Sequence, residues 1–71
     1  MACRTSDEAG QKAQDIQRKL AEGRKAGTIS QDEYVAYNNT VGEGLSAWAE
    51  RQDLRAYCAA LQRVVADASL K

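Results

Sequence analysis

Two pairs of adjacent acidic residues are the side chains in this sequence that most resemble catalytic groups. They are Asp7 with Glu8 and Asp32 with Glu33. Acid–base catalysis needs a group that exchanges protons near neutral pH and is held against a nucleophile or a water. The sequence contains no histidine to serve as that group. Both acidic pairs fall in predicted first turns of helices, where carboxylates stabilise the positive helix end, so we expect no enzymatic activity.

The two cysteines and one glycine-rich stretch are the remaining candidates for chemistry. Cys3 and Cys58 lie far apart and have no histidine to join them, so a zinc site lacks ligands. We expect Cys58 to be a buried small side chain rather than a reactive thiol, and Cys3 to lie in a frayed segment, residues 1–4, and to form an intermolecular disulfide on oxidation. The "GEG" at 42–44 lacks the third glycine of a phosphate-binding loop. The sequence predicts no metal and no cofactor.

Length and composition indicate one small helical domain, residues 1–71. A chain of 71 residues buries only about 60% of the surface that its unfolded form exposes, so its stability is marginal. Only eleven residues are Leu, Ile or Val, and Phe is absent. Ten basic residues balance ten acidic ones and proline is absent, which favours ordered helix. We expect an all-α fold that gains stability by forming a homodimer.

Helix stop and start signals are crowded between Lys25 and Tyr37. Gly27 suits the left-handed position that ends a helix. Ser30 and Glu33 have the spacing of a capping box, which begins the next helix, and Ile29 and Tyr34 occupy the two positions of a hydrophobic staple. The stretch predicts a helix, a tight turn and a second helix.

The same turn reads "GTISQDEY", residues 27–34. Sequences of the form Gly, x, Ile, Ser or Thr, x, acid, acid, aromatic resemble the turn of a short helical hairpin at the ends of many bacterial proteins, often called a SHOCT-like motif. The resemblance covers roughly a third of the chain, and a longer segment follows the turn than that motif usually has. It implies a helical hairpin and no activity.

Hydrophobic spacing predicts a helix over about 6–26, which Thr5 and Glu8 begin with a second capping-box spacing. Its apolar positions make one narrow stripe that should pack inward. They are Ala9, Ala13, Ile16 and Leu20.

After Ser30, two apolar sets recur at helical spacing but point in nearly opposite directions. We therefore expect a break near 51–53 rather than at Gly42 or Gly44, with helices over about 31–50 and 54–69 that complete a three-helix bundle. The alternative is a helical hairpin in which 31–69 is one long kinked helix. The first set is Tyr34, Tyr37, Val41, Leu45 and Trp48, and the second is Leu54, Tyr57, Cys58, Leu61, Val64, Val65 and Ala68.

Charge is distributed unevenly, since residues 28–50 hold four acids and no Lys or Arg, whereas each flanking segment is net basic. Such an acidic strip is either a solvated face or a surface for a basic partner. Basic residues near the end of the first helix raise the alternative of a DNA-binding regulator. The next helix would present Asp32 and Glu33 to phosphates, which makes nucleic-acid binding the weaker interpretation.

No apolar run reaches the roughly twenty residues that span a bilayer, and no signal peptide is recognisable, so we expect a cytoplasmic location and no membrane partner. The function that we expect is a protein–protein interaction module that regulates or inhibits a partner protein by covering its surface. A phage or mobile-element factor that disables a host protein would fit this description. The expected partner-binding residues are Asp32, Tyr37, Glu43 and Trp48, with core packing the alternative role for Tyr37 and Trp48. The expected self-association residues are Leu54, Tyr57, Leu61 and Val65, or Trp48 in their place.

Overall fold

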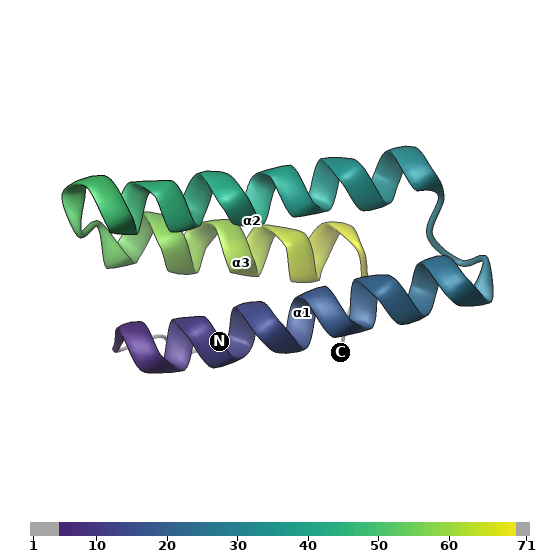
Figure 1. Cartoon of the computed structure of the whole chain (residues 1–71), viewed down its shortest axis with the longest axis horizontal. Helices are drawn as coiled ribbons and strands as arrows, with labels where there is room; N and C mark the ends of the chain where they lie inside the picture. Colours follow the sequence, from purple (N-terminus) through teal and green to yellow (C-terminus); the bar gives the residue numbers. More distant parts are fainter. Residues whose placement is uncertain (1–4, 70–71) are drawn as a thin grey trace.

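The computed structural model describes residues 5–69, which form three helices and no strand. The helices are α1 (Ser6–Ala26), α2 (Gln31–Arg51) and α3 (Leu54–Asp67). Figure 1 shows α2 and α3 running side by side, and α1 packs against both of them. The predicted all-α class is confirmed. The expected frayed segment, residues 1–4, and Cys3 within it lie outside the described residues.

The break between α2 and α3 lies where the sequence places it. Gln52 adopts a left-handed conformation with a φ of 55°, and Asp53 then caps α3 by accepting a hydrogen bond from the Ala56 backbone N–H at 3.0 Å. Helix α2 continues without interruption through Gly42 and Gly44. The alternative of one long kinked helix is therefore wrong. Helix α3 ends at Asp67, two residues before the predicted end.

The turn between α1 and α2 has the predicted chemistry. Gly27 is left-handed, with a φ of 84°, and its N–H is bonded to the carbonyls of α1's last turn. Ser30 and Glu33 form the complete capping box, because the Glu33 N–H donates to the Ser30 hydroxyl at 3.2 Å and the Ser30 N–H donates to the Glu33 carboxylate at 3.0 Å. Ile29, directly before Ser30, is buried in the core. The helical hairpin is thus fixed by local hydrogen bonds.

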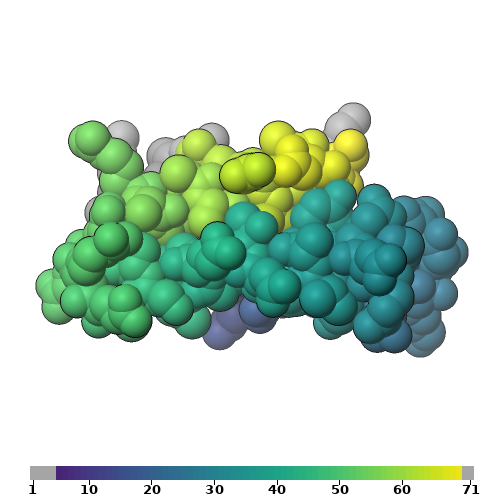
Figure 2. Space-filling model, turned by 90° about the horizontal axis from the view of Figure 1, so that it is seen from above, coloured from purple at the N-terminus to yellow at the C-terminus, as the bar shows by residue number. Residues whose placement is uncertain are grey.

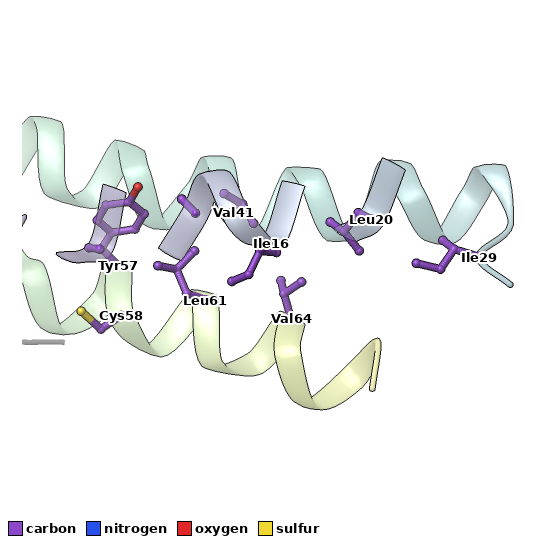
Figure 3. Packing of buried hydrophobic residues seen from close by; sticks show 10 residues of the cluster. Ile16, Leu20, Ile29, Val41, Tyr57, Cys58, Leu61 and Val64 are labelled. Carbon is purple, nitrogen blue, oxygen red and sulfur yellow. The ribbon is translucent and has the colours of Figure 1, made fainter. Parts of the chain in front are cut away.

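The hydrophobic core draws on all three helices and the first turn (Figure 3). All four apolar residues predicted for the first helix are buried. Two leucines of the core, Leu20 of α1 and Leu61 of α3, are 0% exposed. Fully burying such a side chain stabilises a fold by about 1.5–3 kcal/mol. The second apolar set is also confirmed, since each of its members is buried or partly buried.

The first apolar set is only partly correct, because Leu45 is 49% exposed. Gly44 and Ala47 are buried on α2 beside Val41. A Cβ added at Gly44 would lie 2.7 Å from the Ala60 Cβ of α3, so the two helices approach closely at this point. Small residues must face α3 to permit that approach, and this turns Leu45 toward solvent.

Cys58 is buried, as predicted, with 7% of its surface exposed. It is also disulfide-bonded, which the sequence did not predict for this residue. The sequence holds one other cysteine, Cys3. Persistent disulfides are typical of proteins in oxidising compartments, and this counts against the expected cytoplasmic location.

Substitution of the two glycines of α2 by alanine should change stability in opposite directions. Gly44→Ala places a methyl group against Ala60 and the Tyr57 backbone and should destabilise the fold by about 1–3 kcal/mol. Gly42 has no neighbour within 4 Å of an added Cβ, so Gly42→Ala should stabilise the helix by about 0.5–1 kcal/mol. Urea denaturation of both variants measures the difference. Equal effects at the two positions would contradict the close helix approach at Gly44.

Candidate interaction surfaces

The outer side of α2 is the most distinctive surface of the described residues. At 100° per residue, Asp32, Glu43 and Glu50 point within about 20° of one another, and all three are exposed. Figure 2 looks onto this side and shows α2 uncovered along its length. A shallow hollow on it is lined by Asn39 and Gly42 among other residues of the helix. The charged residues of α2 before its last position are all acidic, since 28–50 contains no Lys or Arg, and Arg51 at the end of the helix also lines the hollow.

Exposed hydrophobic side chains lie along one flank of this acidic line. Of the residues that the structure describes, Val35 and Leu45 are the large hydrophobic ones that remain exposed, at 45% and 49%. Both belong to α2, about 60° and 140° from the acidic line on the same flank. Sequence analysis placed Leu45 in the core and did not single out Val35. Their spacing with Gly42 and Ala49, in steps of seven, three and four, was the signal that could have revealed them.

The four predicted partner-binding residues do not share one face. Asp32 and Glu43 lie on the acidic face of α2, whereas Tyr37 and Trp48 are partly buried and pack against the core. The Tyr37 hydroxyl donates a hydrogen bond to the Asp67 backbone carbonyl of α3 at 3.3 Å. Tyr37 and Trp48 therefore have the packing role that the sequence left as an alternative, and the acids are separated from both aromatic rings.

Two titratable groups near the turn have shifted pKa values. Hydrogen bonds from Ser30, chiefly from its backbone N–H, lower the pKa of the Glu33 carboxyl because they stabilise the charged form. Partial burial raises the pKa of Tyr37, and the negative charges of Glu33 and Asp67 raise it further. Both groups therefore keep their ordinary charge at neutral pH, the carboxylate as an anion and the phenol as a neutral hydrogen-bond donor.

The predicted self-association residues on α3 are largely occupied within one chain. Tyr57 and Leu61 are 4% and 0% exposed, respectively. Leu54 and Val65 are partly buried against the same core. A second copy could reach Leu54 and Val65 at the edge of the core, but Tyr57 and Leu61 are inaccessible without opening the fold.

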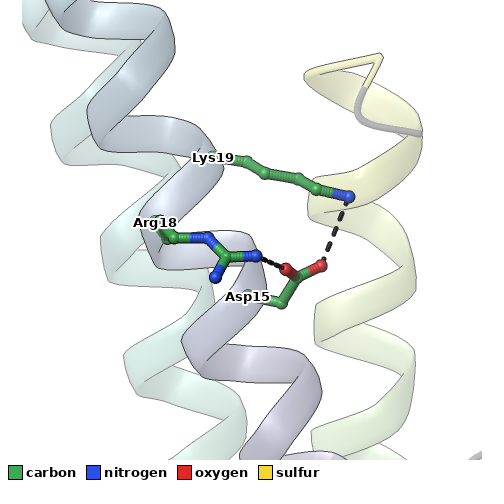
Figure 4. Close-up of polar contacts among 3 residues, drawn as sticks. All are labelled: Asp15, Arg18 and Lys19. Atoms are coloured by element: carbon green, nitrogen blue, oxygen red, sulfur yellow. Dashed lines mark hydrogen bonds and ion pairs between the residues drawn. The ribbon is translucent and has the colours of Figure 1, made fainter.

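Several cations of α1 have partners within the chain. Arg18 and Lys19 both pair with Asp15, and the Lys19 Nζ lies 3.2 Å from its carboxylate (Figure 4). These contacts, with the Lys19 hydrogen bond first, lower the pKa of Asp15. The Arg24 guanidinium lies 5.2 Å from the centre of the Tyr34 ring, a cation–π distance. Part of the basic charge that suggested DNA binding is therefore engaged inside the protein.

Both acidic pairs lie in the first turns of helices, Asp7 and Glu8 in α1 and Asp32 and Glu33 in α2. Glu33 caps α2, and the Glu8 N–H donates to the Thr5 hydroxyl at 3.2 Å at the start of α1. No group of three or more potential metal ligands occurs in this part of the chain. None of its helices is both long and apolar enough to cross a membrane.

Comparison with known proteins gave no match among family models, curated proteins or solved structures. The resemblance of the first turn to a SHOCT-like hairpin therefore rests on the residues 27–34 alone.

The capping box predicts a specific acid sensitivity. Hydrogen bonding lowers the pKa of Glu33 in the folded state below its ordinary value of 4.5. The contribution of the Glu33 carboxylate to folding stability is therefore complete above pH 4.5 and is lost as the pH falls through the folded-state pKa. Glu33→Gln keeps a capping side chain without the titrating charge. The melting temperature of this variant, relative to the parent, should improve as pH falls from about 5 to 2.

Glu43→Gln is the matched control, since it removes the same charge from the same helix away from the cap. It should reproduce the parent's pH profile. Identical profiles for the parent and Glu33→Gln would show that the Glu33 charge does not stabilise the turn.

Proposed function

We propose that this protein is a small helical interaction module that regulates or inhibits a partner protein by covering part of its surface. The observation that carries this proposal is the exposed part of α2, where an acidic line is accompanied on one flank by the exposed Val35 and, further around the helix, by the exposed Leu45. Exposed apolar side chains beside a polar rim are typical of protein interaction sites. The mechanism would be steric occupancy, with no catalytic step. A phage or mobile-element factor that disables a host protein is the biological setting that we favour.

The roles of the four predicted partner-binding residues differ within this proposal. Glu43 and Asp32 would steer a basic partner through long-range attraction, which raises the association rate more than the final affinity. Tyr37 and Trp48 would support the surface from beneath. Leu45 and Val35 take over the role of apolar anchors, because they are more exposed than either aromatic ring.

A DNA-binding regulator is the alternative. Arg24 and Lys25 in the last turn of α1 are exposed and favour it. The acidic face of α2 and zero net charge oppose it. Binding to duplex DNA that weakens steeply with salt would distinguish this alternative from protein binding.

Self-association is part of the proposal, because eleven Leu, Ile and Val residues give one chain little aliphatic volume. The melting temperature should then rise with protein concentration. Light scattering at tens of micromolar, combined with melts over a hundredfold concentration range, measures this. A monomeric mass and a constant melting temperature would show that one chain suffices.

Charge reversal on α2 should slow association with the partner protein. Glu43→Lys should reduce the association rate several-fold at low ionic strength, and the effect should shrink as salt screens the charge. Glu22→Lys makes the same charge change at an exposed position of α1 and should leave the rate unchanged. Affinity capture from the host with both variants as bait identifies the partner, and stopped-flow mixing then measures the rates.

The comparison between the two variants decides the proposal. A partner that is captured by the parent and by Glu22→Lys, but poorly by Glu43→Lys, supports it. A partner that depends on Glu22 and not on Glu43 would place the recognition surface on α1 instead.

A further inference from the structure

A disulfide anchors Cys58 of α3 within the hydrophobic core. Cys58 is 7% exposed and belongs to the same buried cluster as Ala9 and Ala13 of α1. The sequence contains two cysteines, and residues 5–69 contain only Cys58. Within one chain, the partner sulfur is therefore assigned to Cys3, which precedes α1. The bond then ties the chain at the start of α1 to α3.

The first half of α1 and Cys58 lie at the same end of the three-helix bundle. Figure 1 shows α1 and α3 running in the same direction. In Figure 3, Cys58 lies toward one end of the core, whereas Leu20 and Val64 lie toward the other. Because the two helices are parallel, the apolar residues of the first half of α1, Ala9 and Ala13, pack at the end that contains Cys58.

Small residues fill the contact between this half of α1 and the core. Ala9 and Ala13 are buried but contribute one methyl group each, whereas the second half of α1 buries the branched side chains of Ile16 and Leu20. Hydrophobic stabilisation scales with buried apolar area, so the second half is held more strongly. Gly10 weakens the first half further, because glycine is unfavourable in a helix interior relative to alanine. The cross-link therefore lies where the non-covalent packing of α1 is weakest.

We propose that the Cys58 disulfide is a redox-controlled latch that holds the first half of α1, residues 6–13, against α3. While the bond is intact, it offsets the weak packing of this half. Once a dithiol reductant cleaves the bond, residues 6–13 detach, whereas Ile16 and Leu20 keep the second half of α1 in the core. Opening uncovers the end of the core around Tyr57 and Cys58, which are 4% and 7% exposed in the closed form. This inference does not depend on the proposed function.

The switching step is thiol–disulfide exchange with a dithiol. One thiolate of the reductant attacks a sulfur of the protein disulfide, the sulfur–sulfur bond breaks, and the other cysteine leaves as a thiolate that takes up a proton. The second thiol of the reductant then attacks the mixed disulfide and releases the first cysteine. The protein disulfide thus gains two electrons and two protons, and the dithiol is oxidised to a disulfide. Oxidised glutathione reverses the step by the same exchange.

Amide hydrogen exchange of the full chain, with and without dithiothreitol, tests the latch. The exchange rate of amides 10–13 in α1, divided by that of amides 43–46 in α2, should rise at least about tenfold on reduction, because the first segment opens locally while the second stays folded. Oxidised glutathione should restore the original ratio. The melting temperature should fall by on the order of 20 °C on reduction, since the bond closes most of the chain into one loop.

Cys3→Ser removes the assigned partner sulfur without altering the core. It should show the exchange ratio of the reduced parent whether or not dithiothreitol is present.

Gly10→Ala and Gly42→Ala form a matched pair of variants. Both glycines lie in helices and have open space around an added Cβ, so both variants should fold. In the reduced protein, Gly10→Ala should slow the exchange of amides 11–13 by about two- to fivefold, because it strengthens the half of α1 that opens. Gly42→Ala strengthens α2 instead and should leave that exchange unchanged.

Three results would overturn the proposal. The first is an exchange ratio that reduction leaves unchanged. If all amides stayed protected, the bond would be dispensable, and if all lost protection together, it would stabilise the whole fold rather than one half of α1. The second is a disulfide-linked dimer of the oxidised protein on a non-reducing gel, which would show that the bond joins two chains. The third is an equal effect of Gly10→Ala and Gly42→Ala on amides 11–13, which would show that their exchange follows global unfolding.

Discussion

The close approach of α2 to α3 at Gly44 is the contact on which the rest of the structure depends. Its backbone lies against Tyr57 and Ala60, where no side chain larger than hydrogen fits without displacement of a neighbour. That approach brings Val41 into the same buried cluster as Leu20 of α1 and Leu61 of α3, so a chain with little aliphatic volume still closes a core. It also fixes the rotation of α2 about its own axis. The exposure of Leu45 and the position of the acidic face both follow from that rotation.

Sequence reasoning predicted helix boundaries well because the signals that set them are local. The capping box at Ser30 and the left-handed Gly27 involve residues within three or four positions, so spacing alone identifies them. The rotation of α2 could not be predicted in the same way. The sequence of α2 has two apolar stripes, one that includes Leu45 and one of small residues. A prediction from hydrophobicity assigns the stripe with the larger side chains to the core. Only the partner helix, with Tyr57 and Ala60 at the contact, selects the small-residue stripe.

The same rotation explains why the candidate site was predicted only in part. Exposed acids such as Glu43 were placed correctly because a charged side chain has no alternative to the solvent in a core this small. Tyr37 was ambiguous, since an aromatic ring with a hydroxyl suits an interface and a half-buried position equally. Its hydrogen bond to the last turn of α3 could not be predicted, because Asp67 is 30 residues away. Val35 could not be predicted as part of the surface from the apolar set that includes Tyr34, Tyr37 and Val41, because it lies outside the helical spacing of that set.

The residues that hold the fold and those that would bind a partner occupy opposite sides of α2. Gly44 and Ala47 face α3, whereas Gly42 and Leu45 face outward one or two positions away. A glycine lets the backbone of a neighbouring helix approach closely. This would explain both Gly44, which faces α3, and Gly42, if another helix packs on the outer side of α2. The inner glycine is compensated by packing within the chain. The outer glycine, Gly42, has no such contact among the described residues, so its cost to the helix is not offset there.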